Sequence, residues 1–411
     1  MKYIVVLGDG MADYPVAELA GKTPLQAARK PVLDGLARRG TCGLVQTVPE
    51  GMAPGSDTAN LAVFGYDPRI YYNGRSPFEA ASMGIELKEG DVAFRCNLVT
   101  LSAGEPFAEK VMLDHSAGQI TSAEAWELIA LVNKTLGRPE ICFYPGISYR
   151  HLMVWQEAPK DWRLTPPHDI LGQKIGPYLP GGRQGAVLRE MMEKSAGFLP
   201  GHQVNGRRKA EGLGAANAIW LWGHGQRSQL PGFAAKYGLK GAVISEVDLI
   251  KGLGRCAGLE LLEVTGLTGD NNTNFAGMAK AALAALLGGL DFIFLHLEAP
   301  DEYGHRQETD NKVRAIELID EQVLLVLTEE LDARKEMYRM MVLPDHATPL
   351  SLRTHTSDPV PFVIFQSGQE QKSGVAGFDE FSAREAKLFI REGYRLMDLF
   401  LGTCDWREMT K

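Results

Sequence analysis

Short apolar runs rich in Val, Ile and Phe recur along this chain, and stretches with the apolar spacing of amphipathic helices separate most of them. This alternation is typical of a parallel sheet that is covered by helices on both faces. The expected strands are residues 3–8, 43–48, 241–245, 259–264, 291–297, 338–343 and 361–365. Between the first two, Thr23 can cap a helix, Pro24 fits its first position and Gly40 ends it. We therefore expect an α/β fold with a mostly parallel sheet that begins with a βαβ unit.

The middle of the chain departs from this alternation. Residues 122–137 are helix-like and residues 141–155 are strand-like, while the basic run from Arg207 to Lys209 is expected in a solvated loop. A chain of 411 residues is also too long for one ordinary core. We predict a core domain of residues 1–103 and 214–411, interrupted by a smaller α+β domain of residues 104–213.

Charge and cysteine usage limit the possible partners. The formal net charge of -8 argues against a general nucleic-acid binder. The five cysteines are far apart and show neither CxxC nor zinc-finger spacing, so we expect reduced thiols in a cytoplasmic protein. No apolar run has the length and purity of a signal peptide or a membrane span. The sequence does not indicate an oligomeric state.

Ionisable side chains stand at the ends of several expected strands. They are Asp9 after residues 3–8, Asp301 and His305 after residues 291–297, Asp345 and His346 after residues 338–343, and His355 before residues 361–365. Because the carboxyl ends of parallel strands form one crevice, ligands from different strands can converge there. Each residue alone also has an ordinary structural explanation, as a helix cap, a turn former or a solvated side chain. Their shared position at strand ends favours a functional site.

The spacing of these residues is typical of metal ligands. Asp301 and His305 are four apart, which places both on one face of a helix. With His355 they offer two imidazoles and a carboxylate and leave an open position on a metal ion. A second group, Asp9 with Asp345 and His346, would hold a second ion nearby. Two ions roughly 3.5–4 Å apart are the usual clamp for phosphoryl transfer.

Ser56 is the candidate nucleophile. It follows Gly55 in a Pro/Gly-rich turn and opens the helix-like segment SDTANLAVFG. Backbone N–H groups surround a hydroxyl at such a position, and a metal ion could hold it as the alkoxide. The alternative is that Ser56 only caps the helix, with Asp57 and Thr58 as competing caps.

Nine segments carry a family resemblance. GDGMAD, GMAPGSDTANLAVFGYDP, FRCNLVTL, ISYRHLMVW, PPHDILG, IWLWGHG, GAVISEVDLIKG, EAPDEYGH and LPDHATPLSLRTHTSDPVPF resemble, in order and over essentially the whole chain, the archaeal-type cofactor-independent phosphoglycerate mutases of the alkaline phosphatase superfamily. The resemblance implies an alkaline-phosphatase-like core and a small phosphorylated substrate. It also implies two divalent metal ions, with Mn²⁺ as the first choice and Zn²⁺ or Mg²⁺ as alternatives, and no 2,3-bisphosphoglycerate.

The same resemblance assigns roles to the candidate residues. Asp301, His305 and His355 would hold one ion, and Asp9, Ser56, Asp345 and His346 would surround the other. Ser56 would take the phosphoryl group of 3-phosphoglycerate and return it to the 2-hydroxyl, which yields 2-phosphoglycerate. Because water would hydrolyse a phosphoserine, residues 104–213 are expected to form a lid that excludes it.

Anion-binding side chains are expected to hold the substrate. The candidates are Arg75, Arg95, His115, Arg150, His151 and Lys251. A carboxylate or phosphate is held by a guanidinium fork or an imidazolium. Lys251 is included because its segment resembles the place where these mutases keep a lysine near the serine. The alternative for each is a solvated surface charge.

Other functions fit the same metal site. The segments MADYP and ISYRHLMVW resemble a bacterial branch of the family that has also been proposed to act as a homoserine kinase, which would transfer phosphate from ATP. The chain has no GxxxxGK[ST] loop, but a two-metal route to ATP stays open. A phosphomonoesterase and a non-catalytic metal-binding pseudoenzyme are the further alternatives.

Overall fold

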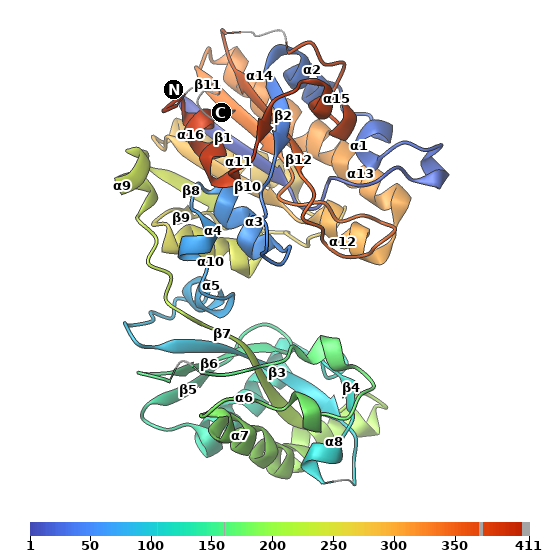
Figure 1. Cartoon of the computed structure of the whole chain (residues 1–411), viewed down its shortest axis with the longest axis vertical. Helices are drawn as coiled ribbons and strands as arrows, with labels where there is room; N and C mark the ends of the chain where they lie inside the picture. Colours follow the sequence, from blue (N-terminus) through green and yellow to red (C-terminus); the bar gives the residue numbers. More distant parts are fainter. Residues whose placement is uncertain (105, 160, 370–372, 405–411) are drawn as a thin grey trace. The chain divides into compact units, whose positions relative to one another are not determined.

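The computed structural model describes residues 1–104, 106–159, 161–369 and 373–404 and divides the chain into two compact units (Figure 1). Unit 1 consists of residues 1–72 and 229–411, and unit 2 of residues 73–228. Unit 2 is longer than the expected insertion of residues 104–213. The reason is that strands β3 (Val92–Leu101) and β7 (Ala218–Gln226), which lie outside that range, pair with each other in the sheet of unit 2.

An eight-stranded sheet forms the centre of unit 1, in the order β13-β2-β12-β11-β1-β10-β8-β9. Its strands are β1 (Lys2–Gly8), β2 (Thr41–Val45), β8 (Gly241–Ile244), β9 (Glu260–Leu261), β10 (Phe292–Leu297), β11 (Tyr338–Leu343), β12 (Val360–Gln366) and β13 (Phe389–Ile390). Only β12 runs antiparallel to its neighbours, β11 and β2. The expectation of a mostly parallel sheet is therefore confirmed, and two strands, β12 and β11, lie between β2 and β1.

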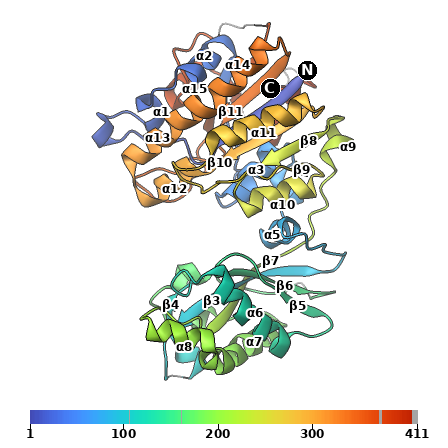
Figure 2. The ribbon, with the colours of Figure 1, turned by 180° about the vertical axis from the view of Figure 1, so that it is seen from behind.

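Helices cover both faces of this sheet. The helices of unit 1 are α1 (Pro24–Ala27), α2 (Pro31–Arg39), α3 (Ser56–Val63), α4 (Pro68–Tyr71), α9 (Phe233–Tyr237), α10 (Asp248–Cys256), α11 (Phe275–Leu287), α12 (Ala299–Arg306), α13 (Thr309–Ile319), α14 (Leu325–Ala333), α15 (Glu380–Glu385) and α16 (Leu396–Leu401). Helices α2, α11, α13 and α14 bury their apolar side chains on one face (Figure 2). On the other face, Phe64 at the end of α3 stacks on Phe294 with ring centroids 4.1 Å apart, and Phe400 of α16 packs against Tyr3.

The single helix expected between Thr23 and Gly40 is two helices in the structure. Thr23 caps α1 as predicted, because its side chain accepts a hydrogen bond from the backbone N–H of Gln26. The helix stops at Ala27, and Pro31 begins α2. Lys30 has φ -133° and ψ 63°, since the residue before a proline avoids the helical region.

Unit 2 has an antiparallel sheet in which β3 is paired with β4 (Met112–Asp114), β6 (Arg150–Trp155) and β7, and β6 is paired with β5 (Ile141–Tyr144). Helices α6 (Ser122–Leu136), α7 (Gly185–Phe198) and α8 (Gln203–Ala210) pack on one face, and α5 (Ser76–Ser82) packs on the other.

The prediction of a solvated loop at Arg207–Lys209 is wrong, because these residues lie in helix α8 and the Arg208 side chain is buried. The Arg208 guanidinium donates to Glu124 and to the carbonyl oxygens of Ala117 and Gly214, which ties α8 to its neighbours. Within the part of the chain that the structure describes, no helix combines the length and the apolar character needed to cross a bilayer.

Candidate metal centre and nucleophile

The strand ends of unit 1 bring the predicted ligands together. β11, β1 and β10 lie side by side and parallel, with Leu7 paired to both Leu343 and His296. The carboxyl ends of all three strands lie at the same edge of the sheet, so Asp9, the Asp345–His346 pair and the start of α12 lie at that edge. Asp9, Asp345 and His346 have no exposed surface, and Asp301 on α12 is 4% exposed.

His346 Nε2 is the centre of a first group of ligand atoms. It lies 3.5 Å from Asp9 Oδ1, 3.4 Å from Asp345 Oδ2 and 3.2 Å from Ser56 Oγ. Ser56 is the first residue of α3, so its hydroxyl stands where the N-terminal backbone N–H groups of the helix are exposed. The structure thus places the candidate nucleophile among three of the predicted metal ligands.

Asp301 is the centre of a second group. Its Oδ2 lies 3.1 Å from His305 Nε2, one helical turn away, and its Oδ1 lies 3.5 Å from His355 Nε2. The two Nε2 atoms of His305 and His355 are 2.9 Å apart, so both imidazoles are directed at the same point. His305 Nδ1 is 3.0 Å from the carbonyl oxygen of Arg353, which leaves Nε2 free to bind a metal if Nδ1 carries the proton. The two groups adjoin, because the rings of His346 and His355 stack with centroids 4.0 Å apart.

Small polar neighbours hold these ligands in place. The Asn60 side-chain amide donates to Asp345 Oδ2 at 2.7 Å and to the carbonyl oxygen of Ser56 at 2.9 Å. The Thr348 hydroxyl donates to Asp301 Oδ1. Gly10 has φ +60°, and a Cβ there would lie 2.6 Å from Asp301 Oδ1, so the turn after β1 requires glycine.

Burial and mutual repulsion shift the titration of these groups. Burial raises the pKa of Asp9 well above its ordinary value, and the Asp345 and Asp301 carboxylates raise it further. Burial also raises the pKa of Asp301, but hydrogen bonds from His305 and His355 outweigh it, so this pKa lies well below its ordinary value. The hydrogen bond to Asp301 raises the pKa of His305 to about 9.

The residues present fit a divalent cation. Asp9 Oδ1 and Oδ2 are buried, and among the described residues they make no hydrogen bond of normal geometry, although His296 Nε2 lies 2.9 Å from Oδ2. The ion pairs that the structure describes for Asp9, Asp301 and Asp345 involve histidines and no Lys or Arg. Buried carboxylates need a compensating cation, and mixed carboxylate and imidazole ligands suit Mn²⁺ or Zn²⁺.

Three sets of side chains in the described chain have ligand atoms close enough to share an ion. They are Asp301 with His346 and His355, Asp9 with Asp345 and His346, and Asp9 with His296 and Glu298. The first two consist of predicted ligands. His296 and Glu298 were not predicted; His296 Nε2 lies 2.9 Å from Asp9 Oδ2, and Glu298 is half-buried.

Four of the predicted anion-binding residues, three of them arginines, lie near one another in unit 2. Arg75 and Arg95 each place Nε 3.1 Å from a carboxylate oxygen of Glu79. Arg95 is 8% exposed, and its guanidinium lies 4.3 Å from the ring centroid of Trp222. Burial lowers the pKa of Arg95 despite Glu79, and the nearby charges of Arg75 and Arg150 lower it further. His115 packs edge-on against Tyr149, beside Arg150.

The other two predicted anion-binding residues differ from this group. His151 is buried in β6, and burial lowers its pKa to about 3, so it is neutral rather than an imidazolium. Its Nδ1 accepts a hydrogen bond from the backbone N–H of Gly146, and its buried Nε2 has no partner among the described residues. Lys251 lies on α10 in unit 1 and places Nζ 3.2 Å from Glu263 Oε2.

Some residues of the centre carry little sequence signal. Asn60 is an exception, because it lies four residues after Ser56 on the same helix and this spacing is visible in the sequence. Thr348 and His296 reach the centre through contacts across elements far apart in the chain, which one sequence does not show.

In unit 2, His168 of the segment PPHDILG packs against Trp222 with ring centroids 5.3 Å apart.

The chain is similar to known proteins over almost its whole length. Residues 37–205 match a family model described as 2,3-bisphosphoglycerate-independent phosphoglycerate mutase. A probable mutase of this name from Geobacter sulfurreducens is 52% identical over 98% of this chain and 100% of its own length, and one from Methanothrix thermoacetophila is 51% identical over the same shares.

Solved structures show the same fold. The PH0037 protein from Pyrococcus horikoshii has a TM-score of 0.81 and 29% identity, with 98% of each chain covered. The cofactor-independent phosphoglycerate mutase from Thermoplasma acidophilum has a TM-score of 0.66 and 26% identity, over 98% of this chain and 100% of its own.

Proposed function

Because the chain belongs to the 2,3-bisphosphoglycerate-independent phosphoglycerate mutase family, we propose that it interconverts 3-phosphoglycerate and 2-phosphoglycerate through a phosphoserine at Ser56. One observation in the structure supports this most strongly. Ser56 Oγ lies 3.2 Å from His346 Nε2, at the point where Asp9 and Asp345 converge. A serine that only capped its helix would not need buried carboxylates and an imidazole around its hydroxyl.

Two divalent ions complete the proposed centre. Asp301, His305 and His355 hold one ion, and Asp9, Ser56, Asp345 and His346 surround the other. We propose Mn²⁺ first, with Zn²⁺ or Mg²⁺ as alternatives, because all three accept carboxylate ligands and differ in their preference for imidazole. When bound, such ions lower the pKa of a coordinated hydroxyl and offset the charge on phosphoryl oxygens.

The serine carries the phosphoryl group between two substrate oxygens. Ser56 Oγ attacks the phosphorus of 3-phosphoglycerate, so that the Oγ–P bond forms and the bond from phosphorus to the C3 oxygen breaks. The proton of the serine hydroxyl ends on the C3 oxygen. The C2 hydroxyl oxygen then attacks the phosphoserine, the P–Oγ bond breaks, and Oγ regains a proton. No group is gained or lost, so the net reaction is an isomerisation.

The side chains of unit 2 supply anion binding. The guanidinium groups of Arg75, Arg95 and Arg150, with His115, take the substrate's carboxylate or phosphate, because charge-assisted hydrogen bonds hold such groups strongly. His151 contributes as a neutral donor through Nε2, since its Nδ1 already accepts a hydrogen bond. Lys251 of unit 1 is retained as a further anion ligand, in exchange for its contact with Glu263.

An activity assay on two serine variants tests the proposal. The purified protein with added Mn²⁺ is offered 3-phosphoglycerate, and separately homoserine with ATP. We expect 2-phosphoglycerate at roughly 1 to 1000 turnovers per second, and loss of this product in Ser56→Ala. Ser122→Ala is the matched control, because Ser122 is also the first residue of a helix, α6. Release of inorganic phosphate alone, product from homoserine alone, or an active Ser56→Ala protein would each contradict the proposal.

A further inference from the structure

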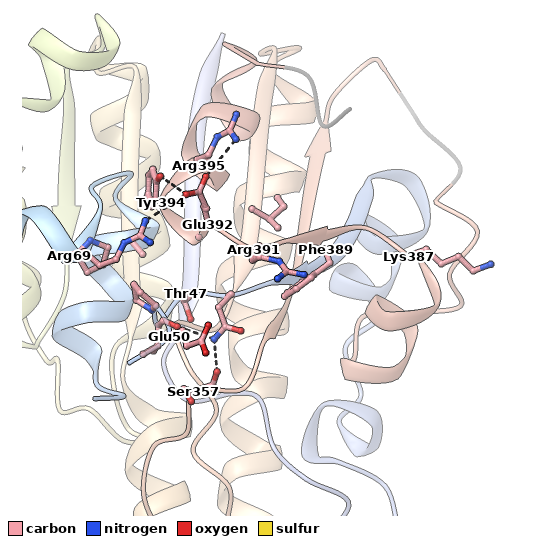
Figure 3. Close-up of a pocket in the computed structure, with 17 residues that line it drawn as sticks. Thr47, Glu50, Arg69, Ser357, Lys387, Phe389, Arg391, Glu392, Tyr394 and Arg395 are labelled. Carbon is pink, nitrogen blue, oxygen red and sulfur yellow. Dashed lines mark hydrogen bonds and ion pairs between the residues drawn. The ribbon is translucent and has the colours of Figure 1, made fainter. Parts of the chain in front are cut away.

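A separate pocket of about 970 Å³ lies in unit 1 (Figure 3). Four segments line it: residues 46–50 after β2, the α3–α4 region with Arg69, Ser357, and residues 387–395 around β13. Neither Ser56 nor any of the proposed metal ligands is among the lining residues. The pocket is therefore distinct from the proposed metal centre, and it falls within the usual size range for small-molecule sites.

The lining is cationic in a chain that is acidic as a whole. Arg69, Lys387, Arg391 and Arg395 line the pocket with only two carboxylates, Glu50 and Glu392, although the chain carries a net charge of -8. Such a local excess of positive charge in a concave site attracts anions.

The carboxylate of Glu392 is already engaged by its neighbours. It lies 3.6 Å from Arg69 and 3.7 Å from Arg395, and it accepts a hydrogen bond from the Tyr394 hydroxyl at 2.9 Å. Arg391, in contrast, makes no side-chain hydrogen bond or ion pair in the part of the chain that the structure describes. Figure 3 shows it beside Phe389, between the Glu392 cluster and Lys387, whose side chain is directed away. Arg391 is thus the cation that is available for a ligand.

A buried hydroxyl on the pocket wall also lacks a partner. Thr47 is 1% exposed and lines the pocket, and its Oγ1 has no hydrogen-bond partner among the described residues. Buried polar groups are nearly always paired, so an unpaired one beside a pocket indicates a group that binds there. The Thr47 hydroxyl can donate a hydrogen bond to an anion. Because the side chain is short, that anion must lie directly against the pocket wall.

From these observations we propose that the pocket binds a phosphate monoester of a small organic molecule. The Arg391 guanidinium pairs with the phosphate, because its planar fork matches phosphate oxygens. Thr47 Oγ1 donates to the same anionic group. The ring of Phe389, which is 37% exposed, packs against the organic part. A bare phosphate ion would fill only a small share of 970 Å³, which is why an ester fits better.

Hydrogen bonds also connect the pocket wall to the two segments that lead to Ser56 and His355. Gln46 Nε2 donates to the carbonyl oxygens of Val48, at 2.9 Å, and Ser357, at 2.5 Å. Ser357 follows His355 by two residues, and the chain from Val48 leads to Ser56. A ligand in the pocket would therefore contact the segments that position a proposed metal ligand and the proposed nucleophile.

Calorimetric titration of the full-length, Mn²⁺-loaded protein tests the pocket. Each titration is run both without and with saturating 3-phosphoglycerate, which fills the proposed catalytic site but is itself a phosphate monoester and competes for any site of this class. The probes are AMP, glucose 6-phosphate and inorganic phosphate. We expect at least one of the two esters to bind with one equivalent per chain. Arg391→Gln should weaken that binding roughly tenfold or more, because it removes a charge-assisted contact. Arg29→Gln is the control, since Arg29 is exposed and does not line the pocket.

Thr47→Val supplies a second, independent variant. Valine keeps the shape and removes only a hydroxyl that has no partner, so the thermal midpoint of the free protein should not fall. Binding of the same ester should weaken several-fold. The proposal is overturned if neither ester binds, if inorganic phosphate is the only probe that binds, or if both variants bind the ester as the unchanged protein does. None of these results bears on the mutase assay, which depends on Ser56.

Discussion

Removing the buried lysine behind the proposed metal centre should cost about 3 kcal/mol of stability. Lys312 has no exposed surface, and its Nζ lies 2.7 Å from Asp13 Oδ2 and 2.8 Å from the carbonyl oxygen of Thr348. Breaking a buried ion pair by removing one partner costs roughly 3–5 kcal/mol. In Lys312→Met, the Asp13 carboxylate keeps backbone N–H donors from Tyr14, at 2.7 Å, and Leu350, at 3.1 Å, which favours the lower end of that range.

The assay must report on unit 1 alone, because the chain has two units and need not unfold in one step. Hydrogen exchange of the β1 and β11 amides at increasing urea concentrations meets this need. Asp13→Asn combined with Lys312→Met should recover part of the loss, since no uncompensated charge is left. Lys280→Met removes an exposed lysine and should change stability by roughly 0.5 kcal/mol or less. A loss below about 1 kcal/mol for Lys312→Met, or a double variant as unstable as the sum of the single ones, would refute the reasoning.

Three further predictions concern charge at and near the centre. Burial raises the pKa of Glu380 from 4.5 to about 7, so the folded state holds this proton more tightly and the free energy of unfolding should fall as pH rises between these values. Glu380→Gln should remove this part of the pH dependence of the thermal midpoint. An unchanged pH dependence in that variant would contradict the prediction. Asn60→Asp places a carboxylate against Asp345 and should lower turnover roughly 10- to 100-fold, whereas full activity would show that the 2.7 Å contact has no role. Chelation of metal should lower the thermal midpoint and Mn²⁺ should restore it, because buried carboxylates such as Asp9 then lack a counter-charge; a midpoint that is insensitive to chelator would argue against a bound ion.

The sequence predicted the main fold because its signal is local. Apolar runs of strand length alternate with helical stretches, and this was enough to place β1, β10, β11 and β12 within a residue or two of their observed bounds. The direction of each strand and its neighbours in the sheet were harder to predict from the sequence. Nothing in residues 41–45 or 360–366 indicates that β12 runs antiparallel between β11 and β2. The break before Pro31 was readable from the proline itself, and the prediction of one helix gave it too little weight.

The convergence of the proposed metal ligands was predictable for a related reason. Residues that directly follow parallel strands meet at one edge, so Asp9 and His346 could be brought together without knowledge of side-chain contacts. Groups that support the ligands were not predictable in this way. Thr348 reaches Asp301 across 47 positions of sequence, and the Arg208 side chain is buried although its segment is strongly polar. Such contacts depend on how elements pack, which local patterns do not encode.

The most direct test of the account is detection of the phosphoserine. The Mn²⁺-loaded protein is mixed with 3-phosphoglycerate, quenched in acid within milliseconds, digested and examined by mass spectrometry. The account predicts phosphate on the peptide that contains Ser56, formed as fast as turnover and absent from Ser56→Ala. Full turnover to 2-phosphoglycerate with no phosphate on Ser56 at any time, or phosphate on another residue that forms at the turnover rate, would contradict it.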